Sequence, residues 1–503
     1  GCHWLRRSAG GPMTDLDFTT EICVIGSGAG GGLAAGYLAQ AGHEVLLLEE
    51  GAQVKASEMT QREEEMLPLL YRDGGKQFSA DGGVAVLQGR ALGGSTVINM
   101  ADVVPIPEGV LAHWAQAYGV DRFTPEQWAK AAGIAAQAIG ANRIQSHELN
   151  RNAQLLLEGG RALGIAGDVF EHNRVGCVGS GYCLIGCAYD AKKSTALTWI
   201  PRGMATGNLR VKTGARVSRL PHKNGRVRAV EGQLLEGHKV VGRFRVKAER
   251  IILAAGAIHS PLILQASLLG GPAVGKNLSL QPQAPVSARF PETVRMFRGI
   301  PQAAYLHGRE TCTPEQGLGG FRIESVSATP GTAAVNGVGW GPELMEVFRD
   351  YTRMGAALCL VPDAPIGQVR RKGFRPVIDY PFSPSWLERL REAMDTCARV
   401  FLASGAEQVY LPVAGFPVVE STADLEALKN WPLAPASLSL ISAHPQGTCR
   451  MGVDPQTSVV DLGFGLHGVD NLQVLDASVF PSTASSHTML PVMQAALLGL
   501  GAV

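Results

Sequence analysis

A glycine-rich turn between two short apolar runs constrains the fold of this chain more than any other feature. The run Ile22–Ile25 is typical of a buried parallel strand, and it leads directly into Gly26-Ser27-Gly28-Ala29-Gly30-Gly31. In such a pattern the first glycine permits a tight turn, the second lets a pyrophosphate approach the backbone, and the third lets a helix pack closely on the sheet. We therefore predict a Rossmann-like βαβ unit within an α/β fold.

The segment after the turn completes a dinucleotide-binding pattern. A helix is expected from about Ala29 to Ala41, with its N-terminal N–H groups and positive dipole end directed at the pyrophosphate. A second apolar run, Val45–Leu48, is followed by Glu49, where an acidic side chain accepts hydrogen bonds from ribose hydroxyls. Because a carboxylate repels a 2′-phosphate, the pattern favours FAD or NAD over NADP.

Composition excludes several classes of protein. A chain of 503 residues with 46% hydrophobic residues predicts two or three globular domains. Its net charge of +1 and the lack of a long basic run argue against a nucleic-acid partner, and no stretch reaches the ~18 apolar residues of a transmembrane segment. Nine mostly isolated cysteines argue against a disulfide framework and indicate a reducing, cytoplasmic location. Residues 1–12, which precede Met13, are expected to be a leader or residues added by cloning.

Six sequence blocks follow one another over nearly the whole chain: Gly26–Gly31 with Glu49, Gly89–Asn99, Gly256–Ser267, Val274–Leu278, His444-Pro-Gln-Gly-Thr-Cys-Arg-Met-Gly452 and Asp476–His487. Together these blocks resemble the glucose–methanol–choline (GMC) family of FAD-dependent alcohol oxidoreductases. A further loop, Cys177–Cys187 with Ala191-Lys-Lys-Ser-Thr195, is similar to the branch that holds long-chain alcohol oxidases and certain bacterial sugar dehydrogenases.

The resemblance implies two domains assembled from separate segments. We expect a Rossmann-like FAD-binding domain and an α+β substrate or cap domain with an antiparallel sheet. The FAD-binding domain is assigned residues 13–53, 81–104, 205–279 and 445–503, and the substrate domain residues 54–80, 105–204 and 280–444.

Carried onto the matching positions, the resemblance also implies an FAD site. It puts the adenine ribose on Glu49 and the adenine near the backbone of Val217. The position that carries a flavin-linking histidine in some members is Ile98 here, so non-covalent FAD is expected. The expected cofactor-binding residues are Gly26, Ser27, Gly28, Ala29, Gly31, Glu49, Arg90, Gly94, Ser95, Asn99, Val217, Asp476, Ala477, Thr488 and Met489.

Two histidines are the candidate catalytic residues. Oxidising an alcohol at a flavin needs a base for the hydroxyl proton, and histidine suits this role because its ordinary pKa, about 6.5, lies near working pH. His444 and His487 lie in two of the matching blocks, and we expect them to converge from two loops. We interpret His444 as the base and His487 as the partner that orients the substrate oxygen. The N-terminus of a helix starting near Met489 is expected to stabilise negative charge on the flavin.

The thiols of Cys177, Cys183 and Cys187 allow two interpretations. Similar spacing binds a three-iron cluster in bacterial sugar dehydrogenases of the family, whereas long-chain alcohol oxidases resemble the loop and are not expected to carry iron. The proline that follows the third cysteine in those dehydrogenases is Ala188 here. We therefore predict no metal, with packing or a disulfide as the role of the thiols.

These features predict FAD-dependent oxidation of an alcohol or sugar CH–OH group to a carbonyl. Hydride would pass to flavin N5, and then to oxygen or another acceptor. Two alternatives stay open: a sugar or polyol dehydrogenase with an iron–sulfur relay to an electron-transfer partner, and an FAD-containing cyanohydrin lyase. Residues 280–440 carry no legible code for the substrate.

Overall fold

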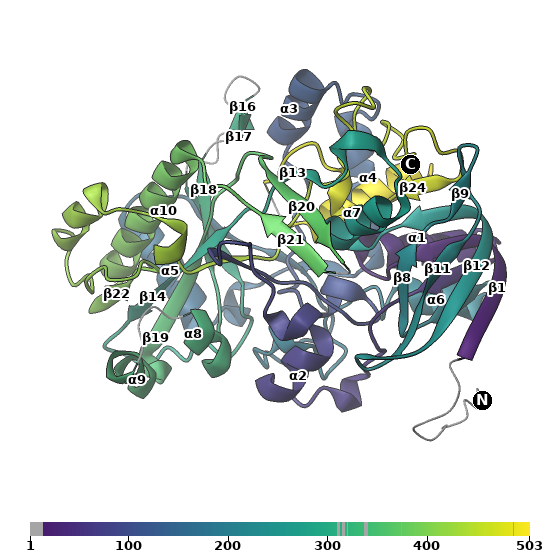
Figure 1. The fold of residues 1–503 in the computed structure, drawn as a ribbon. Coiled ribbons are helices and arrows are strands. Elements are labelled where there is room, and N and C mark those ends of the chain that lie inside the picture. The colour runs from purple at the N-terminus through teal and green to yellow at the C-terminus, as the bar shows by residue number, and fades with distance from the viewer. Residues whose placement is uncertain are drawn as a thin grey trace.

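A computed structural model of the chain describes residues 14–308, 312–313, 317–318, 320–336, 341–373, 375–485 and 487–503. The expected leader, residues 1–12, lies outside these residues. Two large sheets stand at opposite ends of the molecule, as Figure 1 shows, and each carries its own hydrophobic core. In the described part of the chain, no helix is long and apolar enough to cross a bilayer.

The first sheet contains the predicted βαβ unit. Its central strand β1 (Thr14–Ile25) pairs in parallel with β2 (Val45–Leu48) on one side and with β12 (Lys239–Leu253) on the other. The apolar ends of these strands are buried in register, which is the arrangement that a continuous apolar run predicts. The strand order is β7-β2-β1-β12-β11-β8, with β24 paired to β12. The added strands are β7 (Leu209–Lys212), β8 (Ala215–Arg219), β11 (Val230–Glu236) and β24 (Leu472–Val474).

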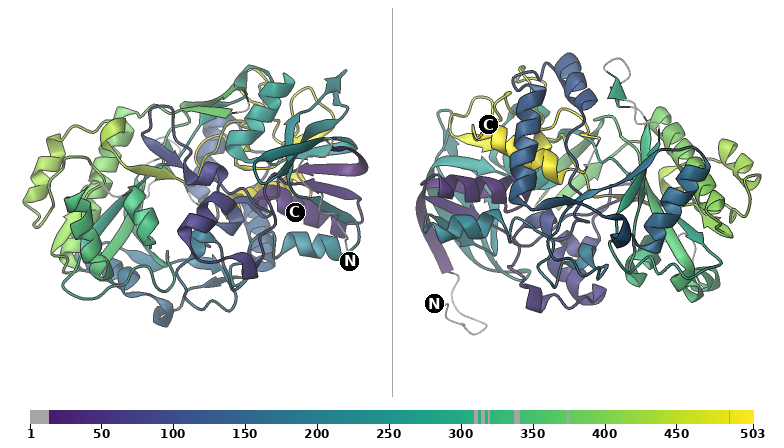
Figure 2. Two further views of the ribbon diagram at one scale, coloured as in Figure 1. Left: turned by 60° about the horizontal axis from the view of Figure 1, so that its bottom comes forward. Right: turned by 180° about the vertical axis from the view of Figure 1, so that it is seen from behind.

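Helices pack closely on this sheet because small residues line their contacts. Helix α1 (Ala29–Gln40) packs against α6 (Trp199–Ala205) and α11 (Met489–Gly499). A β-carbon at Gly36 would come within 2.2 Å of the Trp199 carbonyl oxygen, so only glycine permits this approach of α1 to α6. Helix α4 (Pro125–Ala138) packs on α11, which Figure 2 shows from behind beside the C-terminus.

The second sheet is largely antiparallel. Its order is β3-β23-β14-β19-β18-β15-β5, with β22 paired to β14, and only β3 and β23 pair in parallel. Helices α5 (Arg151–Ala162) and α10 (Pro384–Ala403) pack against each other and against this sheet. The strands are β3 (Val84–Val86), β5 (Gly167–Val169), β14 (Gln283–Arg289), β15 (Ala304–Gly308), β18 (Phe321–Ser325), β19 (Met354–Leu360), β22 (Gln408–Tyr410) and β23 (Leu440–Ser442).

The other elements are shorter or lie outside the two large sheets. A three-stranded sheet is formed by β13 (Lys276–Leu278), β20 (Gly367–Lys372) and β21 (Arg375–Asp379). The remaining helices are α2 (Glu63–Leu70), α3 (Glu108–Tyr118), α7 (Gly256–Ser267), α8 (Pro330–Asn336) and α9 (Pro342–Arg349), and the remaining strands pair as β4 (Ala141–Arg143) with β6 (Glu171–Asn173), β9 (His222–Lys223) with β10 (Arg226–Val227), and β16 (Cys312–Thr313) with β17 (Gly317–Leu318). The predicted class, a Rossmann-like domain beside a domain with an antiparallel sheet, is confirmed.

Some segments lie across the predicted domain boundaries. Helices α3 and α4 and nearly all of α6 fall in the range 105–204, which is assigned to the substrate domain, yet Trp114, Trp128 and Ile200 are buried in the core of the first sheet. Strand β3 falls in the range 81–104, assigned to the FAD-binding domain, yet it belongs to the second sheet. A three-residue strand such as β3 carries no pattern that indicates which sheet it joins.

Candidate active site

A cavity of about 1420 Å³ runs from the carboxyl ends of β1 and β2 to the second sheet. This volume exceeds the ~300–1,000 Å³ of an ordinary small-molecule site, so it can hold a large cofactor together with a substrate. Most of the residues expected at the site line it, whereas Gly31 and Arg90 do not. The lining residues expected from the sequence are Gly26, Ser27, Gly28, Ala29, Glu49, Gly94, Ser95, Asn99, Val217, His444, Asp476, Ala477, His487, Thr488 and Met489.

The three glycines of the turn have three different surroundings. Gly26 has a φ of +95°, and a β-carbon there would lie 2.3 Å from the Ala254 carbonyl oxygen. A β-carbon at Gly31 would lie 1.9 Å from the Gly26 carbonyl oxygen, so Gly31 lets α1 pack against the turn. A β-carbon at Gly28 would meet nothing within 4 Å. The space at the N-terminus of α1 is therefore an open cradle, which fits a pyrophosphate.

Glu49 is fixed at the cavity wall immediately after β2. Its Oε2 accepts hydrogen bonds from the backbone N–H (3.1 Å) and the hydroxyl (2.5 Å) of Ser27, and its Oε1 accepts one from the Gly51 N–H (2.7 Å). Burial raises the pKa of Glu49, and these hydrogen bonds oppose the rise. Two carboxylate oxygens have about four lone-pair sites, so acceptor capacity remains for ribose hydroxyls.

The opposite wall, at the N-terminus of α11, holds the residues expected near the flavin. Asn99 donates from Nδ2 to Met489 Sδ (3.1 Å), and its buried Oδ1 has no hydrogen-bond partner among the residues that the structure describes. A buried acceptor without a partner is costly, so this amide fits a ligand that carries a donor. Asp476, in contrast, accepts from Ser260 Oγ (2.5 Å) and from the Gly256 N–H (2.9 Å), and so holds α7 in place. The cradle, the acceptor Glu49 and this amide together fit a dinucleotide such as FAD.

Arg90 does not reach the cavity. Its Nε donates to Glu50 Oε1 (3.2 Å) and an Nη donates to the Gly237 carbonyl (2.9 Å). Sequence reasoning missed the neighbours that do line the cavity. Arg72 donates two hydrogen bonds to Glu50 (2.7 and 2.8 Å), and, against the effect of burial, Arg72 lowers the pKa of Glu50 to about 2. His259 also lines this end, and burial lowers its pKa to about 3.

The two candidate histidines converge on the cavity, as the sequence predicts. Their ring centroids lie 5.2 Å apart with the rings at 90°. His444 follows β23, and its Nδ1 lies 3.4 Å from the side-chain nitrogen of Gln283, a contact that the sequence did not indicate. Burial and the positive charge of His487 lower the pKa of His444 to about 3, so His444 is neutral at ordinary pH.

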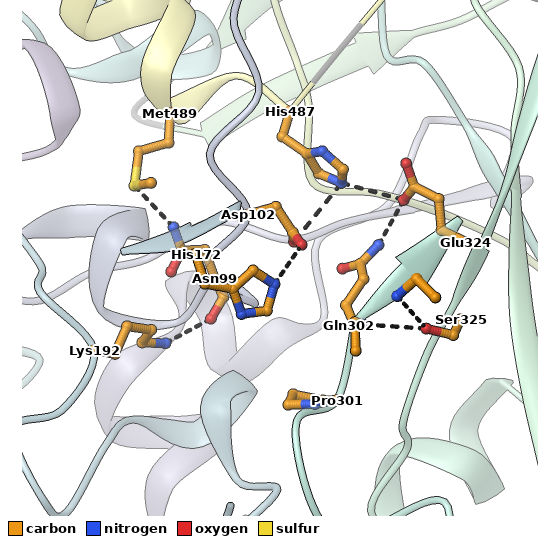
Figure 3. Close-up of polar contacts among 12 residues, drawn as sticks. Asn99, Asp102, His172, Lys192, Pro301, Gln302, Glu324, Ser325, His487 and Met489 are labelled. Carbon is orange, nitrogen blue, oxygen red and sulfur yellow. Dashed lines mark hydrogen bonds and ion pairs between the residues drawn. The ribbon is translucent and has the colours of Figure 1, made fainter. Parts of the chain in front are cut away.

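His487 has the opposite electrostatic environment, drawn in Figure 3. Its Nε2 lies 3.2 Å from Glu324 Oε2 and 3.8 Å from Asp102 Oδ2. Burial disfavours the charged ring, yet these two carboxylates raise the pKa of His487 above its ordinary value. Gln302 donates to Glu324 Oε2 (2.5 Å), and His172 Nε2 lies 3.0 Å from Asp102 Oδ1. Sequence reasoning missed these neighbours, Glu324, Asp102, Gln302 and His172, because none of them lies in a recognisable motif.

Beyond the histidines, the wall of the cavity that the second sheet and its helices provide is largely apolar. Helix α9 with the turn after it, strand β19 and the segment 411–418 each contribute to this wall. Its apolar side chains include Met296, Val326, Leu344, Val347, Phe348, Tyr351, Met354, Leu411, Val413 and Phe416.

The three cysteines of the loop do not line this cavity, although Leu184 between them does. Cys177, Cys183 and Cys187 are free thiols that line a separate cavity of about 20 Å³ together with His172 and Lys192. Burial raises the pKa of Cys183 to about 11, so this group stays a thiol. Within the described residues, no three His, Cys, Asp or Glu side chains are grouped so as to hold a metal ion. That the loop binds no metal stays a prediction.

Comparison with known proteins gives consistent matches. Two family models described as GMC oxidoreductase match residues 68–283 and 367–496, and one described as ketopantoate reductase PanE/ApbA matches residues 22–63. An uncharacterized GMC-type oxidoreductase of Mycobacterium tuberculosis is 32% identical over 480 residues, covering 95% of this chain and 74% of that protein. A long-chain-alcohol oxidase of Arabidopsis thaliana is 25% identical over 520 residues, covering 99% of this chain and 70% of that protein. The crystal structure of pyridoxine 4-oxidase from Mesorbium loti shares the fold, with a TM-score of 0.71 at 22% identity over 95% of this chain and 97% of that one.

Proposed function

The chain belongs to the GMC oxidoreductase family, and we propose that it oxidises the CH–OH group of an alcohol to a carbonyl with non-covalently bound FAD. One observation carries this proposal: His444 and His487 face the same cavity that begins at the Gly28 cradle. We infer that a substrate in this cavity would reach both the proton acceptor and the cofactor.

The residues around the cavity fit FAD held without a covalent bond. The N-terminus of α1 at Gly28 would receive the pyrophosphate, Glu49 the adenine ribose, and Asn99 the flavin end. Ile98 also lines the cavity, and its aliphatic side chain offers no atom for a bond to the flavin. When bound, FAD supplies the acceptor for the electron pair of the breaking C–H bond.

The two histidines divide the work on the hydroxyl group. A neutral His444 can accept the hydroxyl proton at the ring nitrogen that carries no hydrogen. His487, whose Nε2 lies beside two carboxylates, would present a positively charged ring to the substrate oxygen. This charge would stabilise the negative charge that develops on that oxygen. Burial of both rings keeps water away and strengthens these interactions.

The substrate we propose is an alcohol with an apolar body. The wall beyond the histidines presents aliphatic and aromatic side chains such as Val347, Phe348 and Met354, which match hydrocarbon better than the many hydroxyls of a sugar. One relative is named a long-chain-alcohol oxidase, which supports this choice.

The test is an anaerobic titration of the yellow holoenzyme with primary and secondary alcohols, polyols and sugars, followed by flavin absorbance. An apolar alcohol is expected to bleach the flavin and give the matching carbonyl in equal amount. If no CH–OH donor bleaches the flavin while a cyanohydrin is cleaved, the protein is a lyase and the proposal is wrong. Reduction by sugars or polyols alone would overturn the substrate class and keep the reaction type.

A further inference from the structure

We propose that Asp102 and Glu324 are positioning residues that keep His487 positively charged, so that His444 alone accepts the hydroxyl proton of the substrate. This inference rests on the proposed function for its consequence, but the charge state of His487 can be measured without a substrate.

The geometry at one nitrogen atom is the starting point. Both carboxylates approach His487 at Nε2, Glu324 at 3.2 Å and Asp102 at 3.8 Å, as Figure 3 shows. Neither ionised carboxylate can donate a hydrogen bond, so Nε2 must carry a proton. The position of this proton is therefore fixed whether the ring is neutral or charged.

The charges around the ring favour the cation. Glu324 is 0% exposed and Asp102 is 4% exposed, so two negative charges are buried beside His487. Arg322, with an Nη 3.7 Å from Glu324 Oε1, supplies one positive charge. A protonated His487 supplies the second, and the four groups are then neutral together. A buried charge without such compensation is strongly destabilising.

Other titratable groups lie near Asp102, Glu324 and His487, but they do not take the place of the extra proton on His487. Lys192 lies near Asp102, yet its Nζ donates to the carbonyls of Asn99 (2.5 Å) and Cys183 (2.6 Å), and burial lowers the pKa of Lys192. His172 contacts Asp102 at the other oxygen, Oδ1. His444 faces the His487 ring from the cavity side.

The side chains of Asp102, Glu324 and His487 are also held rigidly. Gln302 donates to Glu324, and His172 contacts Asp102, so each carboxylate has a partner besides His487. The ring of Phe170 packs edge to face on His487 with centroids 5.5 Å apart. His487 is thus fixed in place, and its charge repels a second proton from His444 until a substrate arrives. After the hydroxyl proton reaches His444, the same repulsion favours its release.

The test is a histidine titration by NMR on the holoenzyme labelled with ¹³C-histidine, with the His487 signal assigned from its loss in His487→Asn. The wild-type signal is expected to titrate above the ordinary value of about 6.5. Glu324→Gln should lower this pKa by about 1–3 units, the usual effect of one nearby opposite charge. Asp102→Asn should lower it less, because Asp102 lies farther from Nε2.

Asp363→Asn is the matched control. Asp363 is equally buried but accepts its hydrogen bonds from Leu280, Gln281 and Tyr380, so the His487 titration should not change. If Glu324→Gln does not fold, Asp102→Asn still provides the measurement. A wild-type titration at or below about 6.5, or an unchanged titration in the folded carboxylate variants, overturns the inference.

Kinetics separate this inference from the proposed function. The rate of flavin reduction by alcohol should fall to a lower plateau as pH rises through the pKa of His487, and Glu324→Gln should move this alkaline limb to lower pH. If alcohols reduce the flavin and the limb does not move, the positioning role is wrong and the reaction stands. If His487 titrates as expected and no alcohol reduces the flavin, only the proposed function fails.

Discussion

The imidazole rings of His444 and His487 meet edge to face with their centroids 5.2 Å apart. Burial and the neighbouring charge lower the pKa of His444, whereas Glu324 and Asp102, against the effect of burial, raise that of His487. The two rings are alike in chemistry and opposite in charge preference. This difference is the physical basis for giving the proton-accepting role to one and the charge-stabilising role to the other.

The first prediction concerns the acid side of the pH profile. Because the pKa of His444 is lowered to about 3, its neutral form persists well below neutrality and is lost only as pH falls through that value. Alcohol-driven flavin reduction should therefore show no acid limb from His444 between about pH 5 and pH 8, although an unperturbed histidine would titrate at about 6.5. Stopped-flow reduction across this range checks it, and a limb near the unperturbed value that is absent in His444→Gln would contradict it.

The second prediction uses the open space at Gly28. Gly28→Ala introduces no clash with the protein, since a β-carbon there meets nothing within 4 Å, but it fills the cradle meant for the pyrophosphate. Folding should be unaffected, and the Kd for FAD should rise by at least about tenfold, or 1.4 kcal/mol. Gly133→Ala, at a position in α4 that is also open, is the matched control and should leave the Kd unchanged. Equal FAD affinity in the two variants would show that the pyrophosphate lies elsewhere.

The third prediction concerns the ribose site. Glu49→Ala removes an acceptor from the cavity wall and leaves the Ser27 and Gly51 donors without their partner. Hydrogen bonds to a charged group contribute about 1.5–3 kcal/mol, so FAD release on dilution should be faster by one to two orders of magnitude. Glu44→Ala, which breaks an exposed ion pair with Arg210, is the control. Unchanged retention in Glu49→Ala would mean that another group binds the ribose.

The fourth prediction tests the apolar wall. Along a series of straight-chain primary alcohols, kcat/KM for flavin reduction should rise about fourfold per added CH₂, which corresponds to ~0.8 kcal/mol of buried surface. Phe348→Asp, which puts a charge on this wall, should flatten the series and leave FAD binding intact. If kcat/KM of the wild type does not change with the chain length of the alcohol, an apolar substrate is excluded.

The first βαβ unit could be predicted because the local sequence determines where its helix and its second strand begin and end. The helix expected at residues 29–41 is observed at Ala29–Gln40, and the strand Val45–Leu48 is observed with these bounds. The strand expected at Ile22–Ile25 extends back to Thr14, because it pairs with β12 along its whole length. Pairing between distant strands overrides the local pattern there.

The charges that surround the two histidines could not be predicted from the local sequence. His444 and His487 lie in motifs, whereas Asp102 and Glu324 are isolated acidic residues that only the tertiary fold brings to the same imidazole nitrogen. Arg90 shows the reverse case. It lies in a matching block, yet its side chain reaches Glu50 rather than the cavity.

The central claim is that His444 is the base in an alcohol oxidation, and anaerobic stopped-flow reduction of His444→Ala tests it most directly. This variant should fold and retain FAD but be reduced ~10²–10⁴-fold more slowly, which is the usual contribution of a positioned base. His487→Asn should lose less, because asparagine can still donate a hydrogen bond to the substrate oxygen. Reduction of His444→Ala at the wild-type rate, with His487→Ala inactive, would reverse the two roles. Normal reduction of both alanine variants would contradict the account of the site.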